Sequence, residues 1–157
     1  MRRFVLAVCI TIPMTLAGQV VVDKPLSERL TGYDIDVVLD PETHTIRGDM
    51  NAWWVNSSAQ PVGDVMMHMY LNAFSSNKSS FARSGRWSPA GDEGWGRVKI
   101  LSLFDSEGDD LSGSMSFVSP DDGNNDDRTV LHVVLHEPVQ PADTLHLKIG
   151  FESKLPS

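Results

Sequence analysis

The chain has 157 residues, of which 41% are hydrophobic and 22% are charged. These fractions are ordinary for a globular protein and the length suits one domain, so the composition excludes a wholly disordered chain. The formal net charge of -8 comes without the clustered Lys and Arg that neutralise phosphates, and we therefore expect no nucleic-acid partner.

The first residues have the pattern of a secretory signal peptide. Two arginines precede an apolar run over residues 4–17, which is shorter than the roughly 20 residues of a membrane span. We expect residues 1–18 to form the signal, with cleavage near Gly18 or Gln19, and a periplasmic or secreted protein with no stable membrane anchor. An uncleaved anchor is the alternative. The single cysteine, Cys9, lies inside this segment, so the mature chain would contain no disulfide.

Residues 32–71 have the pattern of three successive strands joined by two short polar turns. The strands are expected at residues 33–40, 46–54 and 65–71. In the first strand, apolar side chains alternate with aspartates, and this period of two places them on opposite faces. The sequence therefore predicts a β-meander with one apolar face.

The alternation also predicts which side chains are buried. Val37, Met67 and Met69 are expected on the inner face of one sheet, whereas Asp36 and Asp49 are expected to face solvent. A slip of one residue would invert every one of these assignments, so burial is a sharp test of the register.

A long connection follows the predicted meander. Residues 72–96 are rich in Ser, Asn and Gly around Phe81, Trp87 and Trp95, and residues 79–84 could form a helical turn. Four further strands are expected at residues 98–104, 111–118, 129–135 and 144–151. We therefore predict that residues 19–157 form one all-β domain, an antiparallel two-sheet β-sandwich or saddle of about seven to nine strands.

Two histidines imitate a metal site. His132 and His136 have the spacing of a zinc pair on a helix, but β-branched neighbours and Pro138 favour a strand, on which about 13 Å separates them. His136 and Glu137 also begin a His-Glu-x-x-His pattern, yet Gln140 stands in place of the second histidine. We assign no catalytic residue and no metal ligand to this chain.

The acidic segment at residues 121–127 offers oxygen ligands suited to calcium, but it lacks the spacing and the terminal glutamate of an EF-hand loop. Asp, Asn and Gly are also the residues that turns require. We interpret the segment as a solvated hairpin loop, with calcium binding as the alternative.

Six stretches in order resemble the amino-terminal domain of aminopeptidase N-like zinc metallopeptidases, in their secreted bacterial branch. They are YDIDVVLDP at 33–41, HTIRG at 44–48, WVNSS at 54–58, MHMYLNAF at 67–74, VQPADTL at 139–145 and IGFESKLP at 149–156. Each stretch is short, and their order along the chain carries the resemblance. In this family the amino-terminal domain is a β-sandwich or saddle that precedes the catalytic domain.

The resemblance implies that this chain is the non-catalytic amino-terminal domain of a longer enzyme whose catalytic domain is missing here. The family's zinc-binding motif is absent, and residues 48–51 only imitate its substrate-amine motif. The implied parent would hold zinc and hydrolyse peptides through a zinc-bound water. No cofactor is expected in this chain, whose partner would be the missing catalytic domain.

A different class of protein is also compatible with the sequence. A free-standing extracellular binding module, for carbohydrate or protein, would use Trp53, Trp87 and Trp95 as stacking surfaces. If the chain is instead a domain, Trp87, Trp95 and Phe81 are expected to form an exposed apolar patch where the catalytic domain would pack. The substrate-binding residues stay unassigned.

Overall fold

The computed structural model describes residues 27–89, 91, 94–120 and 122–157. The predicted signal peptide lies outside these residues. Strands make up 50% of the described residues and helices 9%, which confirms the all-β class. None of the helices in the described ranges has the length and apolar character needed to cross a membrane.

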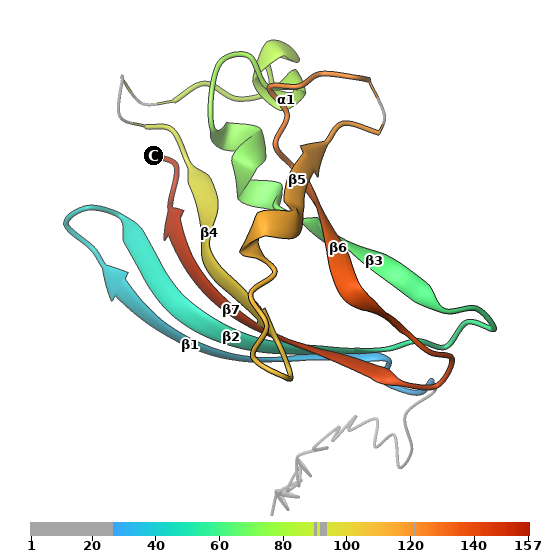
Figure 1. The fold of residues 1–157 in the computed structure, drawn as a ribbon. Helices are drawn as coiled ribbons and strands as arrows, with labels where there is room; N and C mark the ends of the chain where they lie inside the picture. The colour runs from blue at the N-terminus through green and yellow to red at the C-terminus, as the bar shows by residue number, and fades with distance from the viewer. Residues whose placement is uncertain (1–26, 90, 92–93, 121) are drawn as a thin grey trace, which may run out of the picture.

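The described residues form seven strands in two antiparallel sheets, which confirms the predicted sandwich (Figure 1). Sheet A has the strand order β1-β2-β7-β4 and sheet B has the order β3-β6-β5. The strands are β1 (Thr31–Asp40), β2 (Thr45–Val55), β3 (Val62–His68), β4 (Arg97–Asp105), β5 (Met115–Val118), β6 (Val130–Val139) and β7 (Thr144–Lys154). The short helices are η1 (Tyr70–Phe74), α1 (Ser80–Arg83) and η2 (Ser112–Ser114).

The predicted meander is wrong in its third strand. β1 and β2 form the expected hairpin, but β3 pairs with β6 in sheet B, and the second edge of β2 pairs with β7 along eleven residues. The alternation of apolar residues determines which face of a strand is buried, whereas it carries no information on the neighbouring strand. A long-range partner, β7, therefore takes the place that the meander assigned to β3.

Asn56 lies where the chain leaves sheet A for sheet B. Its side chain is fully buried, and its Nδ2 donates to the carbonyls of Gln60 and Val139, both at 2.9 Å. Its Oδ1 accepts from the backbone N–H of Ser58 at 3.0 Å. The predicted turn after β2 is thus held by a buried amide whose polar atoms are all paired, as burial requires.

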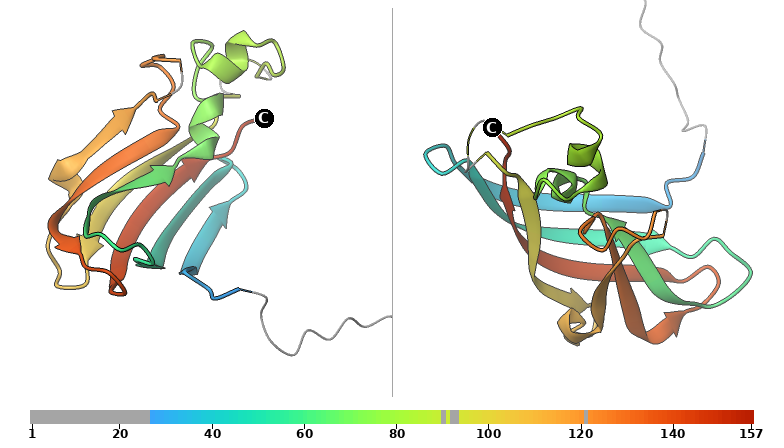
Figure 2. Two further views of the ribbon diagram at one scale, coloured as in Figure 1. Left: turned by 90° about the vertical axis from the view of Figure 1, so that its right-hand side faces the viewer. Right: turned by 90° about the horizontal axis from the view of Figure 1, so that it is seen from above.

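The core lies where sheet B covers β7 and β4. Its buried apolar members are Met69, Leu103, Leu111, Leu131, Val133, Leu135, Leu147 and Ile149. Sheet B has only three strands, and Figure 2 shows it lying over one part of the broader, curved sheet A, with β1 at the far side. The sandwich is therefore closed toward β4 and open toward β1.

The burial prediction holds for Met69, is met in part by Met67 and fails for Val37. Met69 is buried and Met67 is half-buried, while Asp36 and Asp49 are exposed as expected. Val37 is 53% exposed, so its predicted burial is wrong. Its side chain does lie on the inner face of sheet A, but sheet B is too narrow to cover it.

The described part of residues 72–96 is attached to the sandwich through Asn72. This buried side chain accepts from the N–H of Val98 at 2.8 Å and donates to the carbonyl of Arg128 at 2.7 Å. The predicted helical turn is α1, capped by the hydroxyl of Ser79, which accepts from the N–H of Ala82 at 3.1 Å.

The aromatic side chains of this connection pack on one another, so the exposed patch expected from them is not found. The ring centre of Phe74 lies 5.0 Å from that of Trp87 and 5.1 Å from that of Phe81. The ring centres of Trp87 and Trp95 lie 5.4 Å apart. All four are half-buried. Edge-to-face packing of this kind stabilises a small secondary cluster.

Candidate functional site

The apolar surface that the core leaves uncovered lies on β1. Across sheet A, Ile35 is opposite Met50 and Met50 is opposite Ile149. Exposure rises along this line from 2% at Ile149 to 50% at Ile35. The exposed inner-face side chains, which we call the apolar row of β1, are Tyr33, Ile35, Val37 and Leu39.

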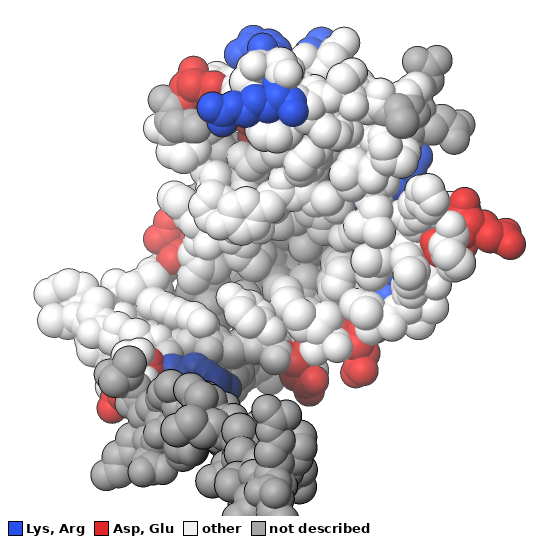
Figure 3. Space-filling model, turned by 180° about the vertical axis from the view of Figure 1, so that it is seen from behind, with Lys and Arg blue, Asp and Glu red and all other residues white. Residues whose placement is uncertain are grey.

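A hollow of about 380 Å³ continues this row between the two sheets. It is lined mainly by Tyr33, Ala52, Trp54, Val65, Met67 and Leu147. Figure 3 shows this side of the molecule. Its hollowed middle is almost free of charged side chains, and acidic side chains lie along its lower edge. We call the apolar row of β1 together with this hollow the open side of the sandwich.

The outer face of sheet A has the opposite character. Arg47 forms an ion pair with Glu152 at 2.7 Å on this face. On β1 the outer face carries Asp34 and Asp36, and Asp36 is directly opposite Asp49 on β2. Like charges directly opposite each other on neighbouring strands repel. The β1 side of this face is therefore an acidic region.

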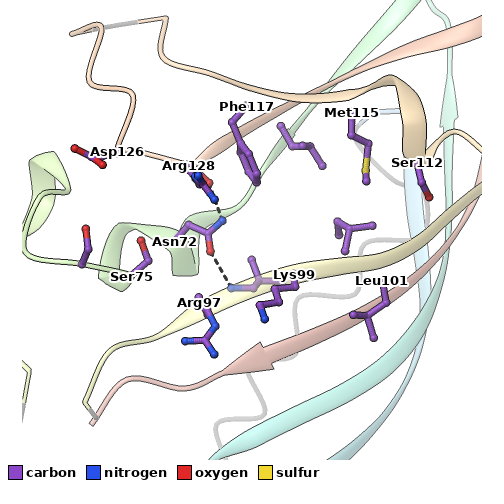
Figure 4. A pocket seen from close by; sticks show the side chains of 14 residues that line it. Asn72, Ser75, Arg97, Lys99, Leu101, Ser112, Met115, Phe117, Asp126 and Arg128 are labelled. Carbon is purple, nitrogen blue, oxygen red and sulfur yellow. Dashed lines mark hydrogen bonds between the residues drawn. The ribbon is translucent and has the colours of Figure 1, made fainter. Parts of the chain in front are cut away.

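A second groove, of about 580 Å³, lies between β4 and β5 (Figure 4). Its apolar lining includes Val98, Ile100, Met115 and Leu131. Figure 4 shows Arg97 and Lys99 on the side of β4 that faces away from Phe117. The guanidinium of Arg128 lies 5.6 Å from the centre of the Phe117 ring. The groove is thus mainly apolar, and two of its three cations point out of it.

The two histidines of the sequence pattern contact different carboxylates. His132 Nε2 lies 2.6 Å from Asp64 Oδ2 on β3, and His136 Nδ1 lies 3.9 Å from Asp109 Oδ2 beyond β4. Both histidines lie on β6, as the strand assignment predicted. The structure does not bring them together.

His136 instead belongs to a group with Asp105 and Asp109, whose ligand atoms lie within 4.8 Å of one another. Asp105 Oδ1, however, already accepts the backbone N–H groups of three residues at 2.9 to 3.0 Å, namely Glu107, Gly108 and Asp109. A carboxylate bonded in this way shapes a turn. We therefore interpret Asp105 as a residue that stabilises the turn after β4.

The acidic loop packs against the first turn of α1. Asp127 Oδ1 accepts the N–H of Ser80 at 2.7 Å, and Asp122 accepts the hydroxyl of Ser80. The hydroxyl of Ser80, followed by the N–H of Asn124, lowers the pKa of Asp122 from its ordinary value. The carboxylates of Asp122 and Asp127 therefore attach the acidic loop to α1. The interpretation of this segment as a solvated hairpin loop did not include these contacts.

The tryptophans proposed as a stacking surface do not share one surface. The ring of Trp53 covers Gly32 on the outer face of sheet A, where a Cβ on the glycine would lie 2.3 Å from Trp53 Nε1. Trp87 and Trp95 belong to the aromatic cluster beside the start of β4. Gly96, next to Trp95, packs on Pro156 just beyond β7, whereas Trp53 is opposite His146 near the other end of that strand.

The sequence predicts the apolar row of β1 but not its exposure. The signal was present, since β1 has the alternation of a strand with one buried face. Only the width of sheet B shows that this face is uncovered. The structural roles of Asn56 and Asn72 were also not predicted, because asparagine is equally typical of exposed turns.

A comparison of the chain with protein-family models finds no match, and a search of curated proteins finds none either.

Proposed function

We propose that this chain is the non-catalytic amino-terminal domain of a secreted, zinc-dependent aminopeptidase-like protein. The ordered resemblance of residues 33–156 supports this proposal, and the two-sheet architecture agrees with it. The single observation that carries it is the exposed apolar row of β1. Isolated monomers seldom expose a contiguous apolar patch of this kind unless it binds something.

In this role the open side packs against a catalytic domain and helps to wall its peptide cleft. Inter-domain contacts typically bury some 600 to 1,500 Å². β1 has ten residues and is therefore roughly 33 Å long, which is sufficient for such a contact. The zinc, its ligands and the glutamate that acts as general base belong to the catalytic domain, and this chain contributes none of them.

The decisive test is the coding sequence that follows codon 157. A His-Glu-x-x-His motif in that frame supports the proposal, and a stop codon directly after Ser157 contradicts it. The purified secreted chain is expected to show no zinc-dependent turnover of amino-acid anilides. Stoichiometric zinc together with turnover would place the catalytic site in this chain instead.

The second candidate function is a free-standing extracellular module that binds a protein. The same open side favours it, since an apolar surface suits a protein partner, whereas the separation of Trp53 from the aromatic cluster disfavours a carbohydrate platform. Both candidates require export. Intact-mass measurement of the secreted protein is expected to show loss of residues 1–17 or 1–18, and retention of Met1 would contradict the predicted signal.

A further inference from the structure

β1 is an edge strand of sheet A, and half of its backbone groups point away from β2. The N–H of Val55 donates to the carbonyl of Leu30 at 2.8 Å, one pair beyond the pairing of Thr31 with Trp54. Hydrogen-bonded pairs alternate along an antiparallel ladder. The even-numbered residues of β1 therefore bond to β2, and the odd-numbered residues present their N–H and C=O groups at the free edge.

These free groups belong to the same residues as the apolar row. In the part of the chain that the structure describes, no backbone hydrogen bond from outside sheet A reaches residues 31–39. A ten-residue edge that offers unpaired groups at every second position is a template for another strand. An added strand would extend sheet A and place alternate side chains beside the apolar row.

The side chains of an added strand would meet two different surroundings. Those opposite Ile35 and Val37 would lie on the inner face, among apolar neighbours. Those opposite Asp34 and Asp36 would lie on the outer face, beside an acidic region that also contains Asp49. Within the described ranges, the ion pairs of the protein do not include these three carboxylates. The surroundings therefore select a strand in which cationic and apolar residues alternate.

A second copy of this chain fits the edge poorly. We consider two copies of β1 paired antiparallel about a two-fold axis at any residue from 34 to 38. In each of these registers, an aspartate of one copy (Asp34, Asp36 or Asp40) lies directly opposite an aspartate of the other copy. Directly opposite side chains have Cβ atoms about 4.5 to 5.5 Å apart, and like charges at that distance are destabilising. The charges on β1 thus act against self-association through this edge.

We propose that the free edge of β1 binds an extended segment of another polypeptide in which Lys or Arg alternates with apolar residues, by adding it as a fifth strand to sheet A. The main-chain bonds form with the odd-numbered residues of β1, the apolar side chains cover the apolar row, and the cations neutralise Asp34 and Asp36. This inference rests on the proposed function in one respect, since it specifies how the partner on the open side is held.

A pair of synthetic peptides tests this pairing on the full secreted chain. One is a capped, fluorescein-labelled nonapeptide in which Lys alternates with Val and Ile, and its counterpart carries Glu in place of Lys. At low salt we expect fluorescence anisotropy to show binding of the Lys peptide at least tenfold tighter than that of the Glu peptide, and weaker binding at high salt. Equal binding of both peptides would overturn the proposed charge selection.

Variants of the chain locate the site. The double variant Asp34→Lys/Asp36→Lys is expected to reverse the preference toward the Glu peptide. Glu107→Lys/Glu137→Lys makes the same change of net charge at exposed positions away from β1 and should leave the preference unchanged. If the control reverses the preference as well, net charge alone is responsible and the proposed site is wrong.

A backbone variant separates strand pairing from simple apolar contact. Ile35→Pro removes an N–H that points away from β2, and an edge strand tolerates proline at such a position. We expect it to weaken peptide binding at least fivefold relative to Ile35→Thr, which keeps the N–H. Equal binding by the two variants would overturn strand pairing. The proposed domain role would survive that result, because it is decided separately by the coding sequence.

Discussion

Two asparagines show how single residues hold the connections of this sandwich. Asn56 and Asn72 are buried, and each bonds backbone groups that are distant in the sequence. Asn56 links the exit of β2 to Val139 at the end of β6. Asn72 links η1 to β4 and to the carbonyl of Arg128. A side-chain amide suits both places because it donates and accepts at once.

Replacing Asn72 by Ala is expected to lower the free energy of unfolding by about 2 to 4 kcal/mol, because it leaves the Val98 N–H and the Arg128 carbonyl without their partner in a covered site. Asn125→Ala provides the control, since this asparagine is exposed and should cost under about 0.5 kcal/mol. Urea denaturation of both variants measures the difference. Equal losses would contradict the bridging role of Asn72.

The methionines of β3 and its end test the register of that strand. Met69 is 6% exposed and belongs to the core, whereas Met66 is 63% exposed. Met69→Ala should cost about 2 to 5 kcal/mol through lost burial and a cavity. Met66→Ala should cost under about 1 kcal/mol, as exposed positions usually do. A larger loss of stability for Met66→Ala would mean that the register of β3 is shifted by one residue.

At the scale of elements, α1 is too short to be stable alone and depends on the acidic loop. A helix of four residues gains almost nothing from its own hydrogen bonds. Its N-terminal turn is held by Ser79, which is buried, and by the contacts of Ser80 with Asp122 and Asp127. The loop and the helix are therefore expected to be ordered together.

The hydroxyl of Ser80 makes this coupling dependent on pH. It is the largest cause that lowers the pKa of Asp122 from 3.8 in the folded chain. Because the folded pKa is depressed, the stabilising contribution is complete above the unfolded pKa and is lost as pH falls through the folded pKa. Ser80→Ala should therefore raise the pKa of Asp122 toward 3.8 and reduce the loss of stability below about pH 4.

Carboxyl carbon chemical shifts of Asp122, followed by NMR during an acid titration, measure this change. Ser84→Ala is the matched control, because its hydroxyl donates to the carbonyl of Phe81 at the other end of α1. An unchanged titration of Asp122 in Ser80→Ala would show that the hydroxyl does not govern this pKa.

The elements were largely predictable from the sequence, and their partners were not. The alternation of apolar residues located β1, β2, β6 and β7, and the predicted ends of these strands differ from the observed ends by a few residues. Its assignment of β3 to the same sheet failed, because Asn56 and the loop after it redirect the chain. The predicted strand at residues 111–118 is shortened to β5, because Leu111 packs in the core and η2 precedes the strand. Pairing depends on contacts across about a hundred residues, such as those between β2 and β7, and periodicity does not encode them.

At the scale of the whole molecule, the unequal width of the sheets determines where a partner can bind. Sheet A has four strands and sheet B has three, so the inner face of sheet A is covered at β7 and β4 but exposed at β1. The sequence suggested Trp87 and Trp95 as the exposed surface, but these rings are half-buried against each other. The apolar side chains of β1, which the sequence assigned to the core, form that surface instead.

The exposed surface of the whole molecule can be located with an apolar fluorescent dye. If the open side is the binding surface, Ile35→Ser/Val37→Ser should reduce the dye fluorescence of the folded chain by at least half, because it removes two side chains of the apolar row. Val38→Ser is the matched control, since Val38 is 74% exposed but lies on the outer face of the same strand. Trp87→Ser should lower stability through the aromatic cluster rather than dye binding. If the dye fluorescence falls only with Trp87→Ser, the aromatic cluster that contains Trp87, and not β1, is the surface that a partner covers.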